Sequence, residues 1–248
     1  MARLRYGDTE VQILRSRPNS VMMSTSLLKT DLGPRMDLLE FATTSSSPEP
    51  PLQAALRTAT WQRTRHGRLM SDIHTGRVLA LVSRMLRPRV ILELGTFTGY
   101  GTLCLLAGLH PEGTLHTVER NEELFPLHDE FWPSAKGHDR IHRHHADAMA
   151  LLADWDTKTM GTLDLVYVDA DKQGVNAQLD ALLPHLSDGG WMLFDNTWWG
   201  GTLDGSDAAT GPKPDALRAL NERLRTDATL ETVVLPVGDG LTAVRKSH

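Results

Sequence analysis

Two clusters of polar side chains directly follow apolar runs of strand length. LFDNTWWGG at 193–201 places Asp195 and Asn196 after one run, and YVDADK at 167–172 places Asp169, Asp171 and Lys172 after another. Ligands bind beyond the carboxyl ends of parallel strands, so we expect the clusters to face one cleft. Asp169, Asp195 and Asn196 would offer an all-oxygen ligand set, which suits Mg²⁺, Ca²⁺ or Mn²⁺ better than Zn²⁺. Each cluster alone fits an ordinary turn equally well.

Two tryptophans follow the Asp-Asn pair. A surface turn has little need of paired indoles, and Trp198 and Trp199 stand directly beside the expected cation ligands. We therefore expect them to line the pocket of a small aromatic substrate.

A glycine-rich turn predicts the cofactor. LELGTFTGYG at 92–101 ends a strand and opens a helix, and its glycines allow a ligand to approach the backbone closely. Glu119 ends the next strand, where a carboxylate can accept hydrogen bonds from ribose hydroxyls. The spacing G-x-x-x-G-x-G differs from the dinucleotide pattern G-x-G-x-x-G. Glu93 would stand badly beside a pyrophosphate and well beside an ammonium or sulfonium, which favours S-adenosylmethionine (SAM) over NAD.

Two alternatives stay open at this point. One is an NAD(P)-dependent oxidoreductase on a Rossmann fold, which the glycine spacing and the lack of a Tyr-x-x-x-Lys pair disfavour. The other is a catalytically inactive SAM binder, which would have no use for a base such as Lys172.

These segments resemble the cation-dependent O-methyltransferases related to caffeoyl-CoA and catechol O-methyltransferases. LELGTFTGYG resembles the cofactor loop of that family, YVDADK and DNTWWGG its metal-binding strand ends, and LPVGDGLTAVRK its carboxyl-terminal hairpin. The resemblance runs from about Leu38 to Lys246. It implies a homodimeric methyltransferase in which Asp169, Asp195 and Asn196 bind the metal and Lys172 is the general base.

The resemblance also implies a set of binding residues. Lys172, Asn196, Trp198 and Trp199 would contact the substrate, and Asp169 would serve both the cofactor and catalysis. The remaining cofactor contacts would be Met70, Ser71, Glu93, Gly95, Phe97, Tyr100, Gly101, Glu119, Arg120, Ala148 and Asp171. Gly101 stands where the family usually has Ser, so a hydroxyl contact is either missing or supplied by Thr102.

The elements that would position these residues alternate along the chain. Strands are expected at 90–94, 114–119, 140–148, 163–171 and 189–196, with helices between them and one helix at 215–226. Further helices are expected near 36–44, 52–65, 72–86 and 121–136. LETVVLPV and GLTAVRK follow, joined by a short glycine turn that suits an antiparallel pair. The pattern predicts a Rossmann-like α/β fold, with a mostly parallel seven-stranded sheet covered by helices on both faces.

Length and composition bound the remaining possibilities. The chain has 248 residues, 40% hydrophobic and 23% charged, and a net charge of −5, which is ordinary for a globular protein. We expect one domain over 1–248, with 1–70 contributing to the substrate pocket or a dimer contact and 71–248 forming the cofactor-binding core. Nothing indicates a nucleic-acid partner, a membrane span or a secretory signal, so we expect a cytoplasmic protein. Cys104, the only cysteine, is expected in the core.

The histidines His138, His142, His144 and His145 lie close together in the sequence. Only one side of a strand can converge on a point, so we interpret them as packing or partly solvated residues rather than as a transition-metal site.

Overall fold

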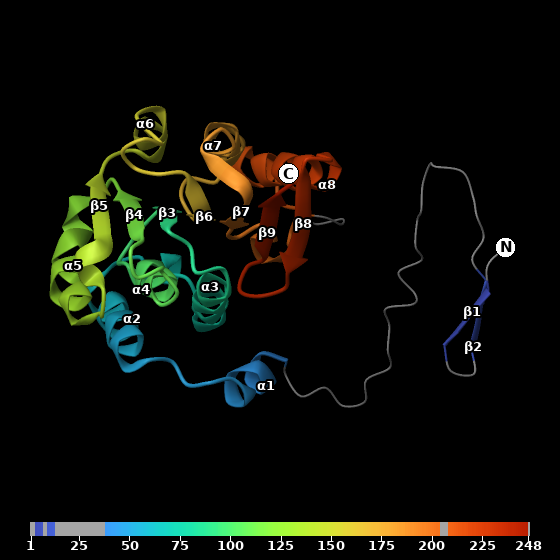
Figure 1. Cartoon of the computed structure of the whole chain (residues 1–248). Coiled ribbons are helices and arrows are strands. Elements are labelled where there is room, and N and C mark those ends of the chain that lie inside the picture. Colours follow the sequence, from blue (N-terminus) through green and yellow to red (C-terminus); the bar gives the residue numbers. More distant parts are fainter. Residues whose placement is uncertain (1–2, 7–8, 13–37, 204–207, 248) are drawn as a thin grey trace. The chain divides into compact units, whose positions relative to one another are not determined.

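The computed structural model describes residues 3–6, 9–12, 38–203 and 208–247 (Figure 1). Contacts divide the chain into two compact units, Met1–Ser46 and Ser47–His248. The first unit contains an antiparallel pair, β1 (Arg3–Tyr6) and β2 (Thr9–Gln12), and the helix α1 (Leu38–Ser45). The sequence pattern did not indicate β1 and β2, whereas α1 lies close to the helix expected near 36–44. That the whole chain is one domain stays a prediction.

The second unit is built on a seven-stranded sheet with the order β5-β4-β3-β6-β7-β9-β8. Strands β3 to β7 are parallel, and β9 pairs antiparallel with both β7 and β8. This confirms the predicted sheet and its terminal hairpin. The strands span Val90–Leu94, Thr114–Glu119, Ile141–His145, Leu163–Val168, Leu186–Phe194, Leu230–Leu235 and Leu241–Lys246, from β3 to β9 in order.

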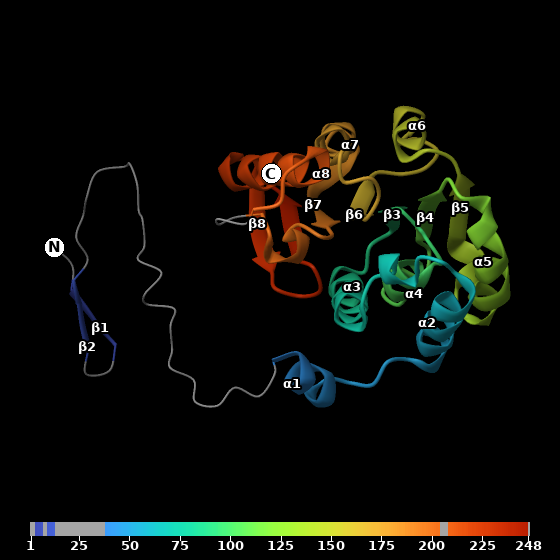
Figure 2. The same cartoon turned by 180° about the vertical axis from the view of Figure 1, so that it is seen from behind.

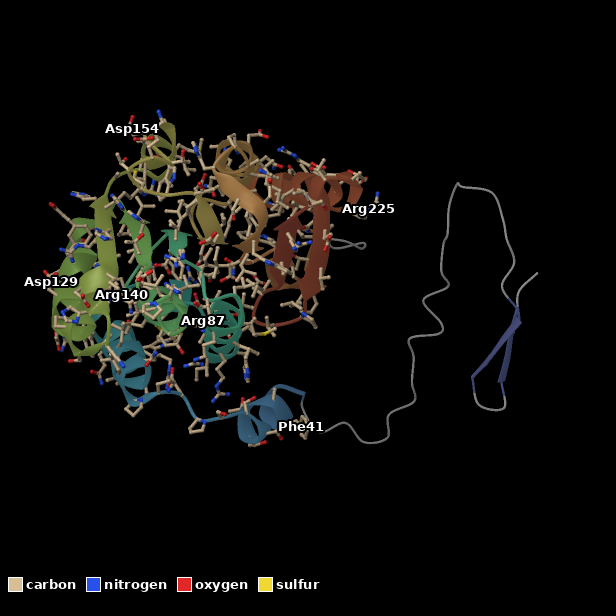
Figure 3. All side chains as sticks on the ribbon, viewed as in Figure 1. Phe41, Arg87, Asp129, Arg140, Asp154 and Arg225 are labelled. Atoms are coloured by element: carbon tan, nitrogen blue, oxygen red, sulfur yellow. The ribbon has the colours of Figure 1, made fainter. Side chains whose placement is uncertain are left out.

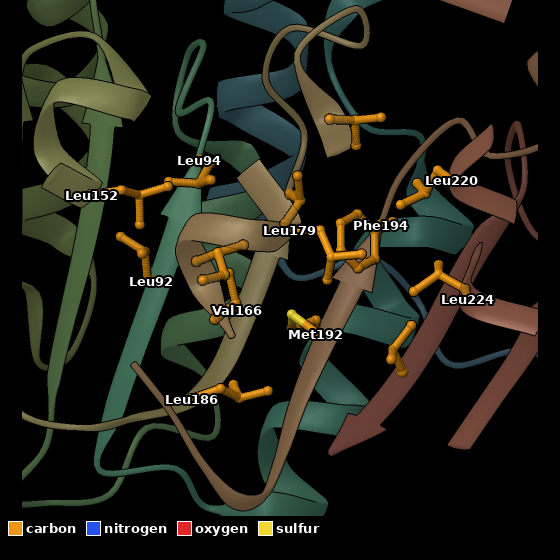
Figure 4. Packing of buried hydrophobic residues seen from close by; sticks show 14 of the residues in the cluster. Leu92, Leu94, Leu152, Val166, Leu179, Leu186, Met192, Phe194, Leu220 and Leu224 are labelled. Atoms are coloured by element: carbon orange, nitrogen blue, oxygen red, sulfur yellow. The ribbon is translucent and has the colours of Figure 1, made fainter. Parts of the chain in front are cut away.

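Helices cover both faces of this sheet (Figures 1 and 2). One face carries α6 (Ala148–Ala153), α7 (Val175–Leu182) and α8 (Pro212–Thr226). The other face carries α2 (Pro51–Arg63), α3 (Ile73–Leu86), α4 (Tyr100–Leu106) and α5 (Phe125–Phe131). Each face has its own buried apolar cluster, because strands covered on both sides must be apolar on both sides. Figure 4 shows the first cluster, in which Leu179 and Leu220 pack toward Val166 and Phe194 of the strands.

Local sequence signals explain where several helices begin and end. The Asp72 carboxylate accepts hydrogen bonds from the backbone N–H groups of His74 and Thr75, so α3 begins there. It ends at Leu86, and the capping residue Arg87 adopts a left-handed conformation immediately before Pro88. Asp147 caps α6 in the same way as Asp72 caps α3.

Two of the differences between the expected elements and the structure have a clear cause in the sequence. Residues 121–136 form a short α5 between the 3₁₀ turns Glu122–Leu124 and Trp132–Ser134, because Pro126 and Pro133 supply no backbone N–H. The predicted strand at 189–196 begins at Leu186 instead, and its pairing with β6 shifts register between Leu163 and Leu165. The polar and glycine residues at 187–190 interrupt the apolar pattern, which hid the first part of this strand.

The outer surfaces of the helices carry charged side chains, as Asp129, Asp154 and Arg225 illustrate (Figure 3). Cys104 is buried and unpaired, as expected. Trp191 of β7 is only partly buried, although it packs against the second apolar cluster. Among the described helices, none combines the length and apolar character that crossing a membrane requires.

Candidate active site

A pocket opens at the carboxyl ends of β3 and β6, beside the start of α4. Eight residues predicted to contact the cofactor line it: Met70, Ser71, Glu93, Gly95, Phe97, Tyr100, Gly101 and Asp169. Leu69, Thr96, Thr98 and Tyr167 complete the lining, and none of these four had been predicted as a contact. The predicted contacts Glu119, Arg120, Ala148 and Asp171 are not among the lining residues.

The glycine turn is held close to the neighbouring strand. Gly95 has φ +96°, and a Cβ added there would overlap the Asp169 carbonyl, so only glycine fits. Phe97 has φ +47°, which is unusual for a bulky residue. Its N–H donates to Glu119 Oε2 at 2.8 Å, and its carbonyl lies 2.7 Å from His128 Nε2. Glu119 therefore shapes the pocket indirectly, by fixing a lining residue.

Glu93 is a buried carboxyl at the base of the pocket, with 1% of its surface exposed. Thr117 Oγ1 donates to Glu93 Oε2 at 2.6 Å, and Thr102 Oγ1 donates to the same oxygen. Burial raises the pKa of Glu93 to about 8, against the opposing effect of the two hydroxyl donors. Thr102 lies outside the pocket lining, and its hydroxyl is bound to Glu93.

The two polar clusters meet between the ends of β6 and β7. Lys172 Nζ donates to Asp169 Oδ1 at 2.8 Å and to the Asp195 carbonyl at 3.1 Å, so it joins both clusters. The Asp195 N–H also donates to the Val168 carbonyl at 3.1 Å. Burial raises the pKa of Asp169 and that of Asp195, and the charge of Lys172 opposes both shifts. Residues 26 positions apart in the sequence are thus brought to one point.

Tyr167 connects this point with Ser71, another residue that lines the pocket. Its hydroxyl donates to Asp195 Oδ2 at 2.6 Å and lies 2.9 Å from Ser71 Oγ. The side chain is 1% exposed. Alternation along β6 could have identified it, since a residue two positions before Asp169 lies on the same side of the strand.

The segment after β7 is held by the hairpin between β8 and β9. The N–H groups of Thr197 and Trp198 donate to the carbonyls of Gly240 and Asp239, each at 3.0 Å. Asn196 and Trp199 adopt left-handed conformations, with φ of 59° and 52°. Trp198 is 54% exposed, whereas Trp199 is partly buried against the first apolar cluster. The two indoles therefore lie in different environments, and neither lines the pocket of Glu93.

The residues around Lys172 fit a hard divalent cation. The Asp169 carboxylate pairs with the Lys172 ammonium at 2.8 Å, and the buried Asp195 carboxylate belongs to the residue whose carbonyl Lys172 also contacts. The site therefore holds two carboxylates and one ammonium, and carboxylate oxygens are the donors that Mg²⁺ prefers. No group of three or more His, Cys, Asp or Glu positioned for a metal occurs within the described residues. A cation here would therefore rest on two carboxylates, with other oxygens such as the Asn196 amide, water or substrate.

The histidines form a stack on β4 and β5 instead of converging on this site. His116 stacks on His142 and His144 with ring centroids 5.0 and 5.2 Å apart, and His116 Nδ1 lies 2.9 Å from His144 Nε2. His138 lies 3.1 Å from the Ala135 carbonyl, and His145 lies 3.2 Å from the Arg120 carbonyl. The packing interpretation agrees with these contacts.

Comparison with known proteins assigns the family. A model described as O-methyltransferase matches residues 42–247. A caffeoyl-CoA O-methyltransferase of Stellaria longipes is 31% identical over 70% of this chain and 74% of its own length. A flavonoid 3',5'-methyltransferase of Vitis vinifera is 30% identical over 78% of this chain and 86% of its own length.

Solved structures show the same fold. An SAH-bound methyltransferase of Podospora anserina has a TM-score of 0.76 at 24% identity, covering 85% of this chain and 94% of that one. An O-methyltransferase of Streptomyces achromogenes in complex with SAM has a TM-score of 0.75 at 23% identity, covering 85% and 95%. The family model spans most of the sequence and nearly all of the sheet-forming unit. The chain therefore belongs to the O-methyltransferase family.

Proposed function

We propose that this enzyme transfers a methyl group from SAM to one hydroxyl of a vicinal diphenol, a small catechol-like molecule, with the help of a divalent cation such as Mg²⁺. The observation that carries the proposal is the meeting of Asp169, Lys172 and Asp195 beside the pocket that contains Glu93. A cation ligand set and a base within reach of a cofactor pocket suit methyl transfer to a hydroxyl. Membership of the family leaves neither the oxidoreductase nor an inactive binder favoured.

In the proposed cofactor pose, the pocket binds the methionine part of SAM. Glu93 faces the ammonium, while the left-handed turn at Gly95 lets the backbone approach the cofactor. Glu119 holds Phe97 through the hydrogen bond at 2.8 Å and keeps a second oxygen, Oε1, on the N–H of Asn121. Ribose hydroxyls would join these existing contacts, because each carboxylate oxygen can accept more than one hydrogen bond.

On the substrate side, Asp169, Asp195 and Asn196 would hold the cation. A bound divalent cation supplies Lewis acidity, which lowers the pKa of a coordinated hydroxyl. Lys172 Nζ, in its neutral form, would accept the proton of the hydroxyl that is methylated. Trp198 and Trp199 would border the aromatic ring. Holding the oxygen in line with the methyl group can contribute roughly 7–11 kcal/mol at best.

The test is methyl transfer from labelled SAM to a panel of vicinal diphenols, with Mg²⁺ or with EDTA. We expect transfer to require the cation, and Asp169→Asn and Asp195→Asn to lower it at least about 100-fold, equivalent to roughly 3 kcal/mol. Asp180→Asn is the matched control, since this exposed carboxylate of α7 pairs with Arg223 at 2.6 Å and belongs to neither strand end. Equal transfer in EDTA would exclude the cation, and transfer to monophenols alone would exclude chelation by two hydroxyls.

We further propose that the enzyme is a cytoplasmic homodimer. Large apolar side chains on α3 support an association, because Leu81 is 56% and Met85 74% exposed. Light scattering after size-exclusion chromatography measures the mass in solution. A mass near the 27.5 kDa of one chain at micromolar concentration would contradict the dimer.

A further inference from the structure

The carboxylate of Asp195 is held by fixed donors on both oxygens. Oδ1 accepts the N–H of Asn196 at 2.7 Å, and Oδ2 accepts the hydroxyl of Tyr167 at 2.6 Å. Asp195 is 5% exposed, so water can provide little alternative. Each oxygen retains lone-pair capacity beyond these bonds, and the two donors fix how the carboxylate is rotated.

The Tyr167 hydroxyl is itself fixed in direction. A phenol carries one proton, and Tyr167 gives it to Asp195, so the Ser71 hydroxyl must be the donor of the 2.9 Å contact with Tyr167. The phenol ring packs in the second apolar cluster with residues such as Leu165 and Leu193, which prevents it from turning away. Ser71 lies in the pocket wall, next to the short 3₁₀ turn Gly67–Leu69.

We infer that Tyr167 is a positioning residue for the cation site, which orients the Asp195 carboxylate through its hydroxyl and is oriented in turn by Ser71. The inference rests on the proposed function, because it assumes that Asp195 binds a cation. Hydrogen-bond partners of metal ligands orient those ligands, and removing one typically lowers metal affinity about 10–100-fold. Ser71 is one bond further from the cation, so its removal has a smaller effect than that of Tyr167.

Titration with Mn²⁺, followed by the electron paramagnetic resonance signal of the free ion, tests the inference in the absence of turnover. Tyr167→Phe removes one oxygen and keeps the buried ring, and we expect it to weaken Mn²⁺ binding about 10–100-fold. Ser71→Ala weakens it less. Tyr100→Phe is the matched control for cation affinity, since this buried phenol also lines the pocket but donates to Glu49 at 2.7 Å. We expect Tyr100→Phe to leave the Mn²⁺ dissociation constant unchanged.

A second measurement separates positioning from a packing role. Affinity for S-adenosylhomocysteine in EDTA should stay within about threefold of the wild-type value in Tyr167→Phe, because the removed hydroxyl serves the cation side. If Tyr167→Phe lowered the affinities for Mn²⁺ and for S-adenosylhomocysteine by the same factor, the packing of the ring would have been damaged, and the inference would be overturned. Unchanged Mn²⁺ affinity in Tyr167→Phe would overturn it as well, with the proposed function intact. A wild-type protein that binds no Mn²⁺ would refute the cation site and the inference together.

Discussion

The raised pKa of the pocket carboxyl Glu93 predicts that cofactor binding releases a proton. The pKa of Glu93 is raised to about 8 because the side chain is buried, and the charges of Asp169 and Glu119 raise it further. At pH 7, about nine-tenths of the ligand-free molecules therefore carry a neutral Glu93. An ammonium group placed beside Glu93 favours the ionised form, so the proton must leave when SAM binds.

The magnitude follows from this pKa. Binding at pH 7 should release about 0.9 proton, and binding at pH 9 about 0.1. The fraction of ligand-free molecules with an ionised Glu93 rises about tenfold between these pH values. The apparent association constant for SAM should rise by the same factor through Glu93. The contribution of Glu93 to SAM affinity therefore increases with pH, because ionised Glu93 is the form that binds.

Isothermal titration calorimetry at pH 7 in two buffers of different ionisation enthalpy measures the number of protons released. Glu93→Gln is the control, because it keeps the shape of the side chain and cannot titrate. The difference between wild type and Glu93→Gln removes any contribution from the amino group of the cofactor itself. Release of the same number of protons by both proteins would refute the assignment of Glu93 to the ammonium.

Three further predictions concern stability. The folded Glu93 carboxyl holds its proton more tightly than the unfolded one, so the free energy of unfolding of the ligand-free protein should fall as pH rises from about 4.5 to about 8, relative to Glu93→Gln; a pH-independent difference in urea denaturation would contradict this. Burial lowers the pKa of His116 to about 4 from 6.5, so its contribution has the opposite sign and is lost as pH falls through that window; His116→Phe should lessen the loss, as thermal melts can show. Gly95→Ala should destabilise the fold by more than the roughly 1–2 kcal/mol expected for a left-handed alanine, since the new Cβ overlaps the Asp169 carbonyl. Gly200→Ala, with φ +64° and open space around it, should cost only that amount. Equal urea midpoints for the two variants would contradict the close approach at Gly95.

The alternation of strands and helices could be predicted because each element carries its own periodic signal. The predicted bounds of β3 and β4 agree with the structure, since VILEL is a largely apolar run closed by a glycine turn and TLHTVE follows Gly113 and ends in the charged segment that starts at Glu119. The break-up of 121–136 was missed because Pro126 and Pro133 sit in a segment whose apolar residues still fit a helix. The pair β1 and β2 was missed because each strand has only four residues, too short a stretch for periodicity to stand out.

The site was predictable where a side chain stands at a strand end. Parallel strands bring their carboxyl ends to one edge, and Asp169 and Asp195 meet there for that reason. Tyr167 was missed because its role depends on the partner strand and on Ser71, neither of which is near it in sequence. The support of Phe97 by His128 likewise depends on a distant helix, α5.

The hairpin that holds Thr197 and Trp198 has a consequence for how the protein is made. β9 lies between β7 and β8 in the sheet, and its preceding turn supplies the carbonyls of Asp239 and Gly240 to the segment after Asp195. A ribosome synthesises this turn long after the glycine turn at 95–101. A nascent chain can therefore form the pocket that contains Glu93 before the segment after Asp195 is fixed. A protein truncated before Leu241 would lack β9, whose buried Leu241 and Val244 belong to the two apolar clusters, so it should lose the ordered segment after Asp195 together with part of the core beneath it.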